Sequence, residues 1–289
     1  MKNFLDHDRQ WEQLTQLFQE GRLPHGLLFT GPEGVGKRQV ALDLARTMLE
    51  CGTNPAEHPD FISLEPEGKS IKIDRIREIK ATLPYAPLRG RCRIILINDA
   101  HLMRAGAANA LLKSLEEPPE GNYFILITHA LGWIPSTIRS RCQIFRFAPL
   151  QESHLRKILA EQNIDLPEAM LPWTQGSVSL SRIISEAKDR VPSLRSLFPS
   201  REGIHFGQAY ELAQSVAETG QVEPFLQTLL LALHQVMVGP RKNQKYDFDL
   251  LTFADRILEI QGGLRQNINP KINLTRLLMH FQEPKESRL

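Results

Sequence analysis

The chain alternates short apolar runs with stretches in which apolar residues recur at helical spacing. The runs lie at 27–29, 60–65, 93–97, 123–127 and 143–147, and those at 93–97 and 123–127 have the continuous apolar character of strands buried on both faces of a parallel sheet. Helical periodicity fills the intervals between them, over 3–20, 39–50, 73–80 and 105–115. This alternation predicts an α/β domain with a parallel sheet over residues 1–150.

The second half of the chain has helical periodicity only. Residues 151–192 predict a small helical lid around a loop at 165–167, and residues 192–202 read as a linker. Long helices are then predicted over 206–219, 223–238 and 248–267. We interpret residues 203–289 as an all-α oligomerisation domain.

A glycine-rich loop, Gly31-Pro32-Glu33-Gly34-Val35-Gly36-Lys37-Arg38, joins the first strand to the next helix. Backbone N–H groups of such a loop cradle phosphate, the helix N-terminus adds its dipole, and the lysine adds positive charge. The last position departs from the motif, because a Ser or Thr hydroxyl would hold Mg²⁺ where this chain has Arg38. The alternative interpretation is a glycine turn that only joins strand to helix.

Polar residues end the two apolar strands that are expected beside this loop. The strand at 93–97 ends in Asn98-Asp99, where metal-assisted hydrolysis normally uses two carboxylates. Asp99 is alternatively a helix cap. The strand at 123–127 ends at Thr128, where a γ-phosphate would be sensed. Asn98-Asp99 and Arg38 together argue against ATP hydrolysis in this pocket.

Composition excludes several classes of protein. The formal charge is only +2, from 35 basic and 33 acidic residues, so any contact with nucleic acid must be local. Residues 1–10 lack an apolar signal core, and no apolar run approaches the roughly 18 residues of a membrane span, which predicts a cytoplasmic protein without membrane contact. Cys51, Cys92 and Cys142 are odd in number and far apart, which argues against a disulfide framework or a zinc site and predicts three buried thiols.

Two further signatures carry a resemblance. The sequence AANALLKSLEEPP at 107–119 is followed, after the strand that ends in threonine, by Ser140-Arg141-Cys142. In this order, behind a phosphate loop, they resemble the clamp-loader subunits of the AAA+ ATPase superfamily. The resemblance is strong over about 14–150 and weaker beyond, where it rests on Gly176-Ser177 and on 267–271. It implies a P-loop AAA+ domain with a parallel sheet, then a helical lid, then an all-α collar.

The resemblance also implies a ring of five subunits with ATP between neighbours, in which Arg141 reaches the next subunit's site. A guanidinium brought in trans to a γ-phosphate stabilises the charge of phosphoryl transfer. The alternative is a surface arginine. Arg139 is expected on the same side of an extended chain as Arg141, as supporting charge.

Departures from the ATPase members of the family define the expected role. Arg38 replaces the hydroxyl, Asn98-Asp99 replaces an Asp-Glu pair, and Ser179 stands where an arginine is expected. We therefore expect a subunit with little or no ATPase of its own, with Arg141 as a trans arginine finger and no metal site. Binding of ATP or ADP is left open, with Mg²⁺ disfavoured and no zinc; the residues concerned are Gly31, Gly34, Gly36, Lys37, Arg38, Asp99 and Thr128.

The partners that this role implies are a motor ATPase subunit of the tau/gamma type and a delta subunit in a heteropentamer, together with the sliding clamp and primed DNA. Two alternatives remain open. One is a self-sufficient AAA+ ATPase, and the other is a nucleotide-binding scaffold outside replication.

Overall fold

The structure is a computed structural model. It describes residues 4, 6–52, 54–68, 70–166, 168, 171, 174–187, 206–218, 222, 225–226, 229–230, 250–264 and 269–279. The predicted linker at 192–202 and most of the predicted helix at 223–238 lie outside these residues. The chain divides into two compact units, Met1–Ile158 with Gln175–Ser179, and Leu159–Thr174 with Leu180–Leu289.

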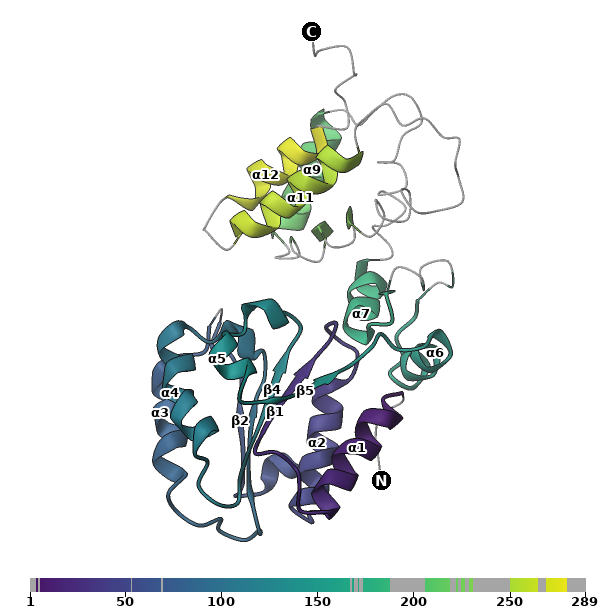
Figure 1. The fold of residues 1–289 in the computed structure, drawn as a ribbon. Helices are drawn as coiled ribbons and strands as arrows, with labels where there is room; N and C mark the ends of the chain where they lie inside the picture. Colours follow the sequence, from purple (N-terminus) through teal and green to yellow (C-terminus); the bar gives the residue numbers. More distant parts are fainter. Residues whose placement is uncertain are drawn as a thin grey trace. The chain divides into compact units, whose positions relative to one another are not determined.

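The first unit is built on a five-stranded sheet in which every pair of neighbours is parallel (Figure 1). The strands lie in the order β2-β3-β4-β1-β5. Their bounds are β1 Gly26–Thr30, β2 Phe61–Leu64, β3 Arg93–Ile97, β4 Asn122–Thr128 and β5 Gln143–Arg146. The prediction of a parallel α/β sheet is confirmed, and β3 has the predicted bounds.

Helices cover both faces of this sheet (Figure 1). α1 (Asp8–Gln19) packs with α2 (Lys37–Met48) on one face, and α3 (Ile73–Thr82) packs with α4 (Ala105–Glu116) on the other. The short α5 (Ser136–Arg139) contacts α4. Three 3₁₀ turns complete the unit, at Pro55–Glu57, Ala100–Leu102 and Leu131–Trp133. The unit is therefore a three-layer sandwich with the sheet in the middle.

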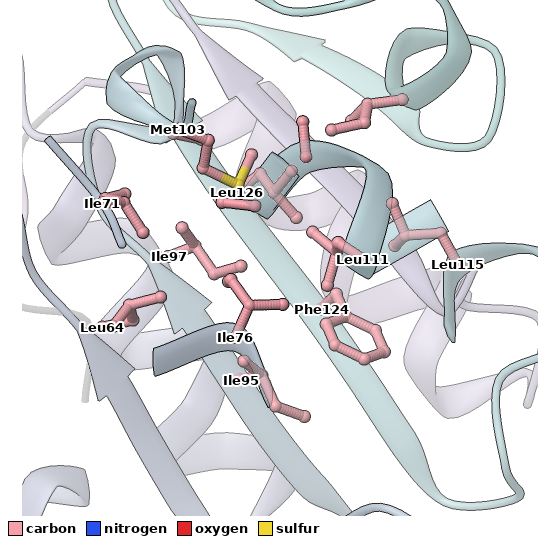
Figure 2. Close-up of a cluster of buried hydrophobic side chains, with 14 of the residues drawn as sticks. Leu64, Ile71, Ile76, Ile95, Ile97, Met103, Leu111, Leu115, Phe124 and Leu126 are labelled. Atoms are coloured by element: carbon pink, nitrogen blue, oxygen red, sulfur yellow. The ribbon is translucent and has the colours of Figure 1, made fainter. Parts of the chain in front are cut away.

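The core between the sheet and α3 and α4 explains the apolar strand runs (Figure 2). Alternate residues of neighbouring strands point to this face and have no exposed surface, among them Leu28, Ile95, Ile97, Phe124 and Leu126. The residues between them, such as Phe29, Leu96 and Ile125, are equally buried toward the other face. Because both faces are covered, the sequence shows unbroken apolar runs instead of alternation.

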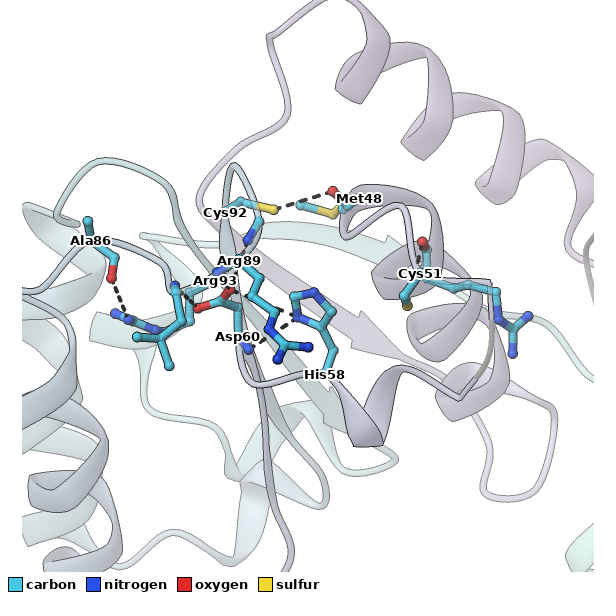
Figure 3. Close-up of polar contacts among 11 residues, drawn as sticks. Met48, Cys51, His58, Asp60, Ala86, Arg89, Cys92 and Arg93 are labelled. Carbon is cyan, nitrogen blue, oxygen red and sulfur yellow. Dashed lines mark hydrogen bonds and ion pairs between the residues drawn. The ribbon is translucent and has the colours of Figure 1, made fainter.

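Asp60 organises the loop between α3 and β3 (Figure 3). Its carboxylate is fully buried and accepts hydrogen bonds from the backbone N–H groups of Leu88, Arg89 and Gly90, at 2.5–3.0 Å. Burial raises the pKa of Asp60, but these three donors outweigh burial and hold the pKa below its usual value. One charged residue that precedes β2 therefore holds residues 88–90 of this loop.

Arg93, the first residue of β3, holds the other side of the same loop. Its guanidinium donates to the carbonyl oxygens of Thr82, Tyr85 and Ala86 at 2.7–3.1 Å, and its side chain is buried (Figure 3). A buried arginine whose donors meet carbonyl oxygens is satisfied without a carboxylate partner. The loop between α3 and β3 is thus anchored from both sides.

The described helices of the second unit enclose a separate apolar cluster. They include α9 (Phe206–Glu218), α11 (Leu250–Leu264) and α12 (Pro270–Met279), which bury Ala213, Phe253 and Leu274 among others. α6 (Glu152–Glu161) and α7 (Val178–Ala187) each cross a boundary between the units. The lid and collar boundaries stay predictions.

The cysteines correct one expectation. All three are free thiols, but only Cys92 is buried, whereas Cys51 and Cys142 are half-buried. Burial raises the pKa of Cys92 to about 11 and that of Cys142 to about 12, so both are protonated at neutral pH. Among the described helices, none is long and apolar enough to cross a bilayer.

Substituting Asp60→Asn tests the anchored loop. We expect the free energy of unfolding near neutral pH to fall by about 2–3 kcal/mol, because hydrogen bonds to a charged acceptor contribute about 1.5–3 kcal/mol each and an amide oxygen cannot replace all three. The difference in free energy of unfolding between wild type and variant should decrease as the pH falls below about 4. The pKa of Asp60 is lowered in the fold, so its carboxylate stabilises the fold only while it is ionised. Urea unfolding followed by circular dichroism measures both effects.

Asp74→Asn is the matched control, because Asp74 is 74% exposed and pairs with Arg77 on the surface of α3. It should change stability by less than about 0.5 kcal/mol. Equal effects of the two substitutions would contradict the anchoring role of Asp60.

Candidate functional site

The phosphate loop at 31–36 connects β1 to α2, so its backbone leads into a helix N-terminus. Gly31 and Gly34 have positive φ angles of 147° and 73°. A Cβ at Gly31 would lie 2.2 Å from the carbonyl oxygen of Phe147, and one at Gly34 would lie 2.4 Å from Ser177 Oγ. Both positions therefore require glycine, because other parts of the first unit pack directly on the loop.

Lys37 begins α2, directly after Gly36, and its side chain turns back onto the loop. Nζ donates to the carbonyl oxygen of Gly31 at 2.7 Å and also to that of Pro32, and Lys37 is only 5% exposed. Burial lowers the pKa of Lys37 to about 8, although the charges of Glu33 and Asp99 raise it. The ammonium group is thus still mostly charged at neutral pH, and it lies close enough to Asp99 to sense that carboxylate.

Two segments that are distant in sequence hold the carbonyl groups of the same loop. His7 Nε2 lies 2.7 Å from the Val35 oxygen, and the Val178 N–H donates to the Gly34 oxygen at 2.9 Å. Burial lowers the pKa of His7, so this contact is made by the neutral ring with its proton on Nε2. These contacts and those of Lys37 occupy carbonyl oxygens, whereas phosphate binding uses N–H groups. The loop is therefore braced without losing its donors to these partners.

Arg38 is not a metal ligand, because its guanidinium has no lone pair to offer and pairs with a carboxylate. Its guanidinium pairs with Glu65, just beyond the end of β2, at 3.2 Å, and the two side chains are about half exposed. Such a surface pair contributes little to stability. The position that would supply a hydroxyl to Mg²⁺ thus carries a cation with its own carboxylate partner.

Asp99 and Thr128 both lie at the carboxyl edge of the sheet, at the ends of neighbouring strands. β3 and β4 are neighbours, and Asp99 follows β3 while Thr128 ends β4. Asn98 Nδ2 donates to Asp99 Oδ2 at 3.2 Å, so the amide supports the carboxylate. Asp99 also precedes a 3₁₀ turn but caps it with no side-chain hydrogen bond, which removes the capping interpretation.

Sequence reasoning missed two histidines at this edge. His101 Nδ1 lies 3.3 Å from Thr128 Oγ1, and His129 Nδ1 lies 3.9 Å from Asp99 Oδ1. The signal was present, because each histidine closely follows the end of a strand. It could not be used without the strand order, which makes β3 and β4 neighbours.

Arg141 lies between α5 and β5 and is held within its own chain. Nη1 donates to the carbonyl oxygen of Thr137 at 2.9 Å and to Ser140 Oγ at 3.1 Å, and Nη2 forms an ion pair with Glu116 of α4. The side chain remains 33% exposed. The guanidinium is therefore oriented by α4 and α5 and still accessible from outside.

Arg141 and the phosphate loop lie at opposite edges of the sheet. Leu27 pairs with Gln143 in parallel strands, so Arg141 precedes the amino end of β5, whereas the loop follows the carboxyl end of β1. Four residue steps of about 3.3 Å along β1 separate the two edges by about 13 Å. Arg141 is thus too far away to act on its own loop.

Arg139 differs from the expectation. Residues Ser136–Arg139 form the helix α5, so Arg139 and Arg141 do not alternate along an extended chain. The Nε atoms of both arginines are buried and have no hydrogen-bond partner. Pro135 stands just ahead of the first turn of this helix.

The relatives of this chain include DNA polymerase III subunits. The chain is 33% identical over 219 residues to DNA polymerase III subunit delta' of Bacillus subtilis, a match that covers 68% of this chain and 67% of the relative. It is 26% identical to the subunit tau of the same organism, over 94% of this chain but 48% of that protein. The chain therefore spans about half the length of that longer relative.

Solved structures confirm the fold. A DNA polymerase III gamma subunit-related protein of Thermotoga maritima superposes with a TM-score of 0.60 at 21% identity, and the match covers 95% of this chain and 99% of that protein. The chain therefore shares the fold of this gamma subunit-related protein.

The family follows from the first unit. Residues 6–151, which contain the phosphate loop, Asp99, Thr128 and Arg141, match the family described as DNA polymerase III, delta subunit. This match and the relative from Bacillus subtilis confirm the sequence-based expectation of a delta-prime-like clamp-loader subunit. The chain belongs to the DNA polymerase III delta subunit family.

Proposed function

We propose that this protein acts in DNA replication as a delta-prime-like subunit of a clamp loader, which places the sliding clamp on primed DNA. In this role it hydrolyses little or no ATP and donates Arg141 to the ATP site of a neighbouring motor subunit of the tau/gamma type. A delta subunit completes the proposed heteropentamer. The proposed division of labour is an AAA+ domain at 1–150, a lid at 151–192 and an oligomerisation collar at 203–289.

The observation that carries this proposal is the place of Arg141. It lies at the sheet edge opposite its own phosphate loop, one third exposed, with its guanidinium oriented by Thr137, Ser140 and Glu116. An arginine that is accessible but too far from its own loop is suited to a phosphate on another subunit. Docking would then exchange the Glu116 carboxylate for a more highly charged phosphate partner.

The state of the phosphate loop supports the absence of turnover. Arg38 carries a positive charge where Mg²⁺ needs an oxygen ligand, and Asn98 offers an amide where a second carboxylate is needed. The glycines and Lys37 that hold phosphate remain. We therefore assign to the loop the capacity to bind ATP or ADP, without Mg²⁺-dependent hydrolysis.

The isolated chain should show negligible ATP turnover, and Arg38→Thr alone should not restore it. The substitution supplies one hydroxyl ligand, but Asn98 still takes the place of a carboxylate beside the loop. Steady-state phosphate release by wild type and variant measures this, with the motor subunit as the positive control. Robust turnover by the isolated wild-type chain would favour the self-sufficient ATPase instead.

Arg141→Ala should slow ATP hydrolysis at the neighbouring motor site by about 10³-fold or more, the range typical of arginine fingers. Because the other motor sites keep their own donors, the total clamp- and DNA-stimulated rate falls by the share of that one site. The measurement is the ATPase rate of the reconstituted loader, with single-turnover kinetics to resolve the affected site.

Arg77→Ala is the matched control, since Arg77 is an exposed arginine on α3 that pairs with Asp74. It should leave the rate of the assembly unchanged. An Arg141→Ala loader that assembles and hydrolyses ATP like wild type at every site would refute the finger assignment. Failure of the wild-type chain to join the other subunits would favour the scaffold outside replication.

A further inference from the structure

Three metal-ligating side chains meet at the carboxyl ends of β3 and β4. Asp99, His101 and His129 each offer one ligand atom, and these atoms all lie within 4.8 Å of one another. Asp99 is the second residue after β3, His101 belongs to the 3₁₀ turn Ala100–Leu102, and His129 directly follows β4. The hydrogen-bonded pairing of β3 with β4 brings the backbone at the start of all three side chains together.

The distances suit a single ion after a small adjustment. Asp99 Oδ1 and His129 Nδ1 are 3.9 Å apart, and the centroids of the two imidazole rings are 4.2 Å apart. Tetrahedral ligands at about 2.0–2.2 Å from a metal ion lie roughly 3.3–3.6 Å from one another. Separations of up to 4.8 Å therefore need to close by at most about 1.5 Å, which side-chain rotation can supply.

Two of the ligands are supported from behind. Asn98 Nδ2 donates to Asp99 Oδ2, which leaves Oδ1 on the side of His129. Thr128 Oγ1 accepts the Ala130 N–H at 3.0 Å and lies 3.3 Å from His101 Nδ1. If Nδ1 donates its proton to the second lone pair of that hydroxyl oxygen, the lone pair of the imidazole is on Nε2. Such outer contacts orient the ligands of protein metal sites and set the histidine tautomer.

The donor set selects the kind of metal. Two imidazoles and one carboxylate suit Zn²⁺ and related first-row ions, whereas Mg²⁺ prefers oxygen ligands alone. The Lys37 ammonium senses the Asp99 charge and opposes a cation there, so the affinity must come from the nitrogen donors. The Asp99 and His129 side chains are 35% and 36% exposed, which gives an ion access from solvent.

We propose that Asp99, His101 and His129 form a binding site for Zn²⁺ or a similar divalent transition-metal ion. Three protein ligands leave a coordination position for water or for a phosphate oxygen. The site differs from a nucleotide Mg²⁺ site in its ligands and in its metal, and it departs from the sequence-based expectation of no metal. It stands independently of the clamp-loading role.

The test titrates the full-length, chelator-treated chain with ZnCl₂ by isothermal calorimetry, and with CoCl₂ by visible absorption. We expect one strong equivalent of either metal and, for Co²⁺, the d–d bands of a low-coordinate site with nitrogen ligands. His129→Ala should weaken Zn²⁺ binding by at least about tenfold, since even the loss of an outer contact costs about 10–100-fold. His129 is exposed, so circular dichroism should confirm that the variant folds.

Asp99→Asn is the second variant, which keeps the size of the side chain and should also weaken Zn²⁺ binding by at least about tenfold. His25→Ala is the matched control, because His25 precedes β1 at the opposite edge of the sheet and stacks on Tyr123. It should bind Zn²⁺ like wild type. The proposal is overturned if the wild-type chain takes up no Zn²⁺, if both site variants retain wild-type affinity, or if His25→Ala weakens binding equally.

Discussion

The parallel pairing of five strands governs everything else in the first unit. When all strands run the same way, the residue after each strand reaches one edge of the sheet and the residue before each strand reaches the other. The order β3-β4-β1 therefore lines up Asp99, Thr128 and the phosphate loop at the carboxyl edge. Arg141, which precedes β5, is placed at the amino edge. The phosphate loop and Arg141 are therefore separated by the length of a strand.

Because of this separation, the two edges of the sheet carry different functional groups. A molecule with a phosphate-holding edge and an arginine-donating edge can meet different neighbours on its two sides, as a ring of non-identical subunits requires. The loop keeps its glycines and lysine, yet its carbonyl groups are held by Lys37, His7 and Val178. Arg141 is held by Glu116 in a pair that is still accessible. The arginine edge thus has the groups that its proposed role needs, whereas the loop edge carries Arg38 and Asn98 where metal-assisted hydrolysis typically uses a hydroxyl and a carboxylate.

Much of this arrangement could be predicted from local sequence. β3 was placed to the residue, because a strand buried on both faces is an unbroken apolar run. The phosphate loop and the helix after it were equally clear from the glycine spacing. Strand order was not readable, since apolar runs do not say which strands become neighbours, and so Asp99, His101 and His129 were not grouped. Arg139 was assigned to extended chain because a single turn such as α5 is too short to show helical periodicity. Cys51 and Cys142 were expected to be buried on residue type alone, and type does not report the packing of a loop.

The most direct test of the trans role of Arg141 is a structure of the reconstituted loader with a non-hydrolysable ATP analogue. The guanidinium of Arg141 should leave Glu116 and lie at hydrogen-bond distance, about 2.7–2.9 Å, from a γ-phosphate oxygen bound to the neighbouring subunit. An assembled ring in which Arg141 still pairs with Glu116 while the adjacent ATP site is filled would contradict it.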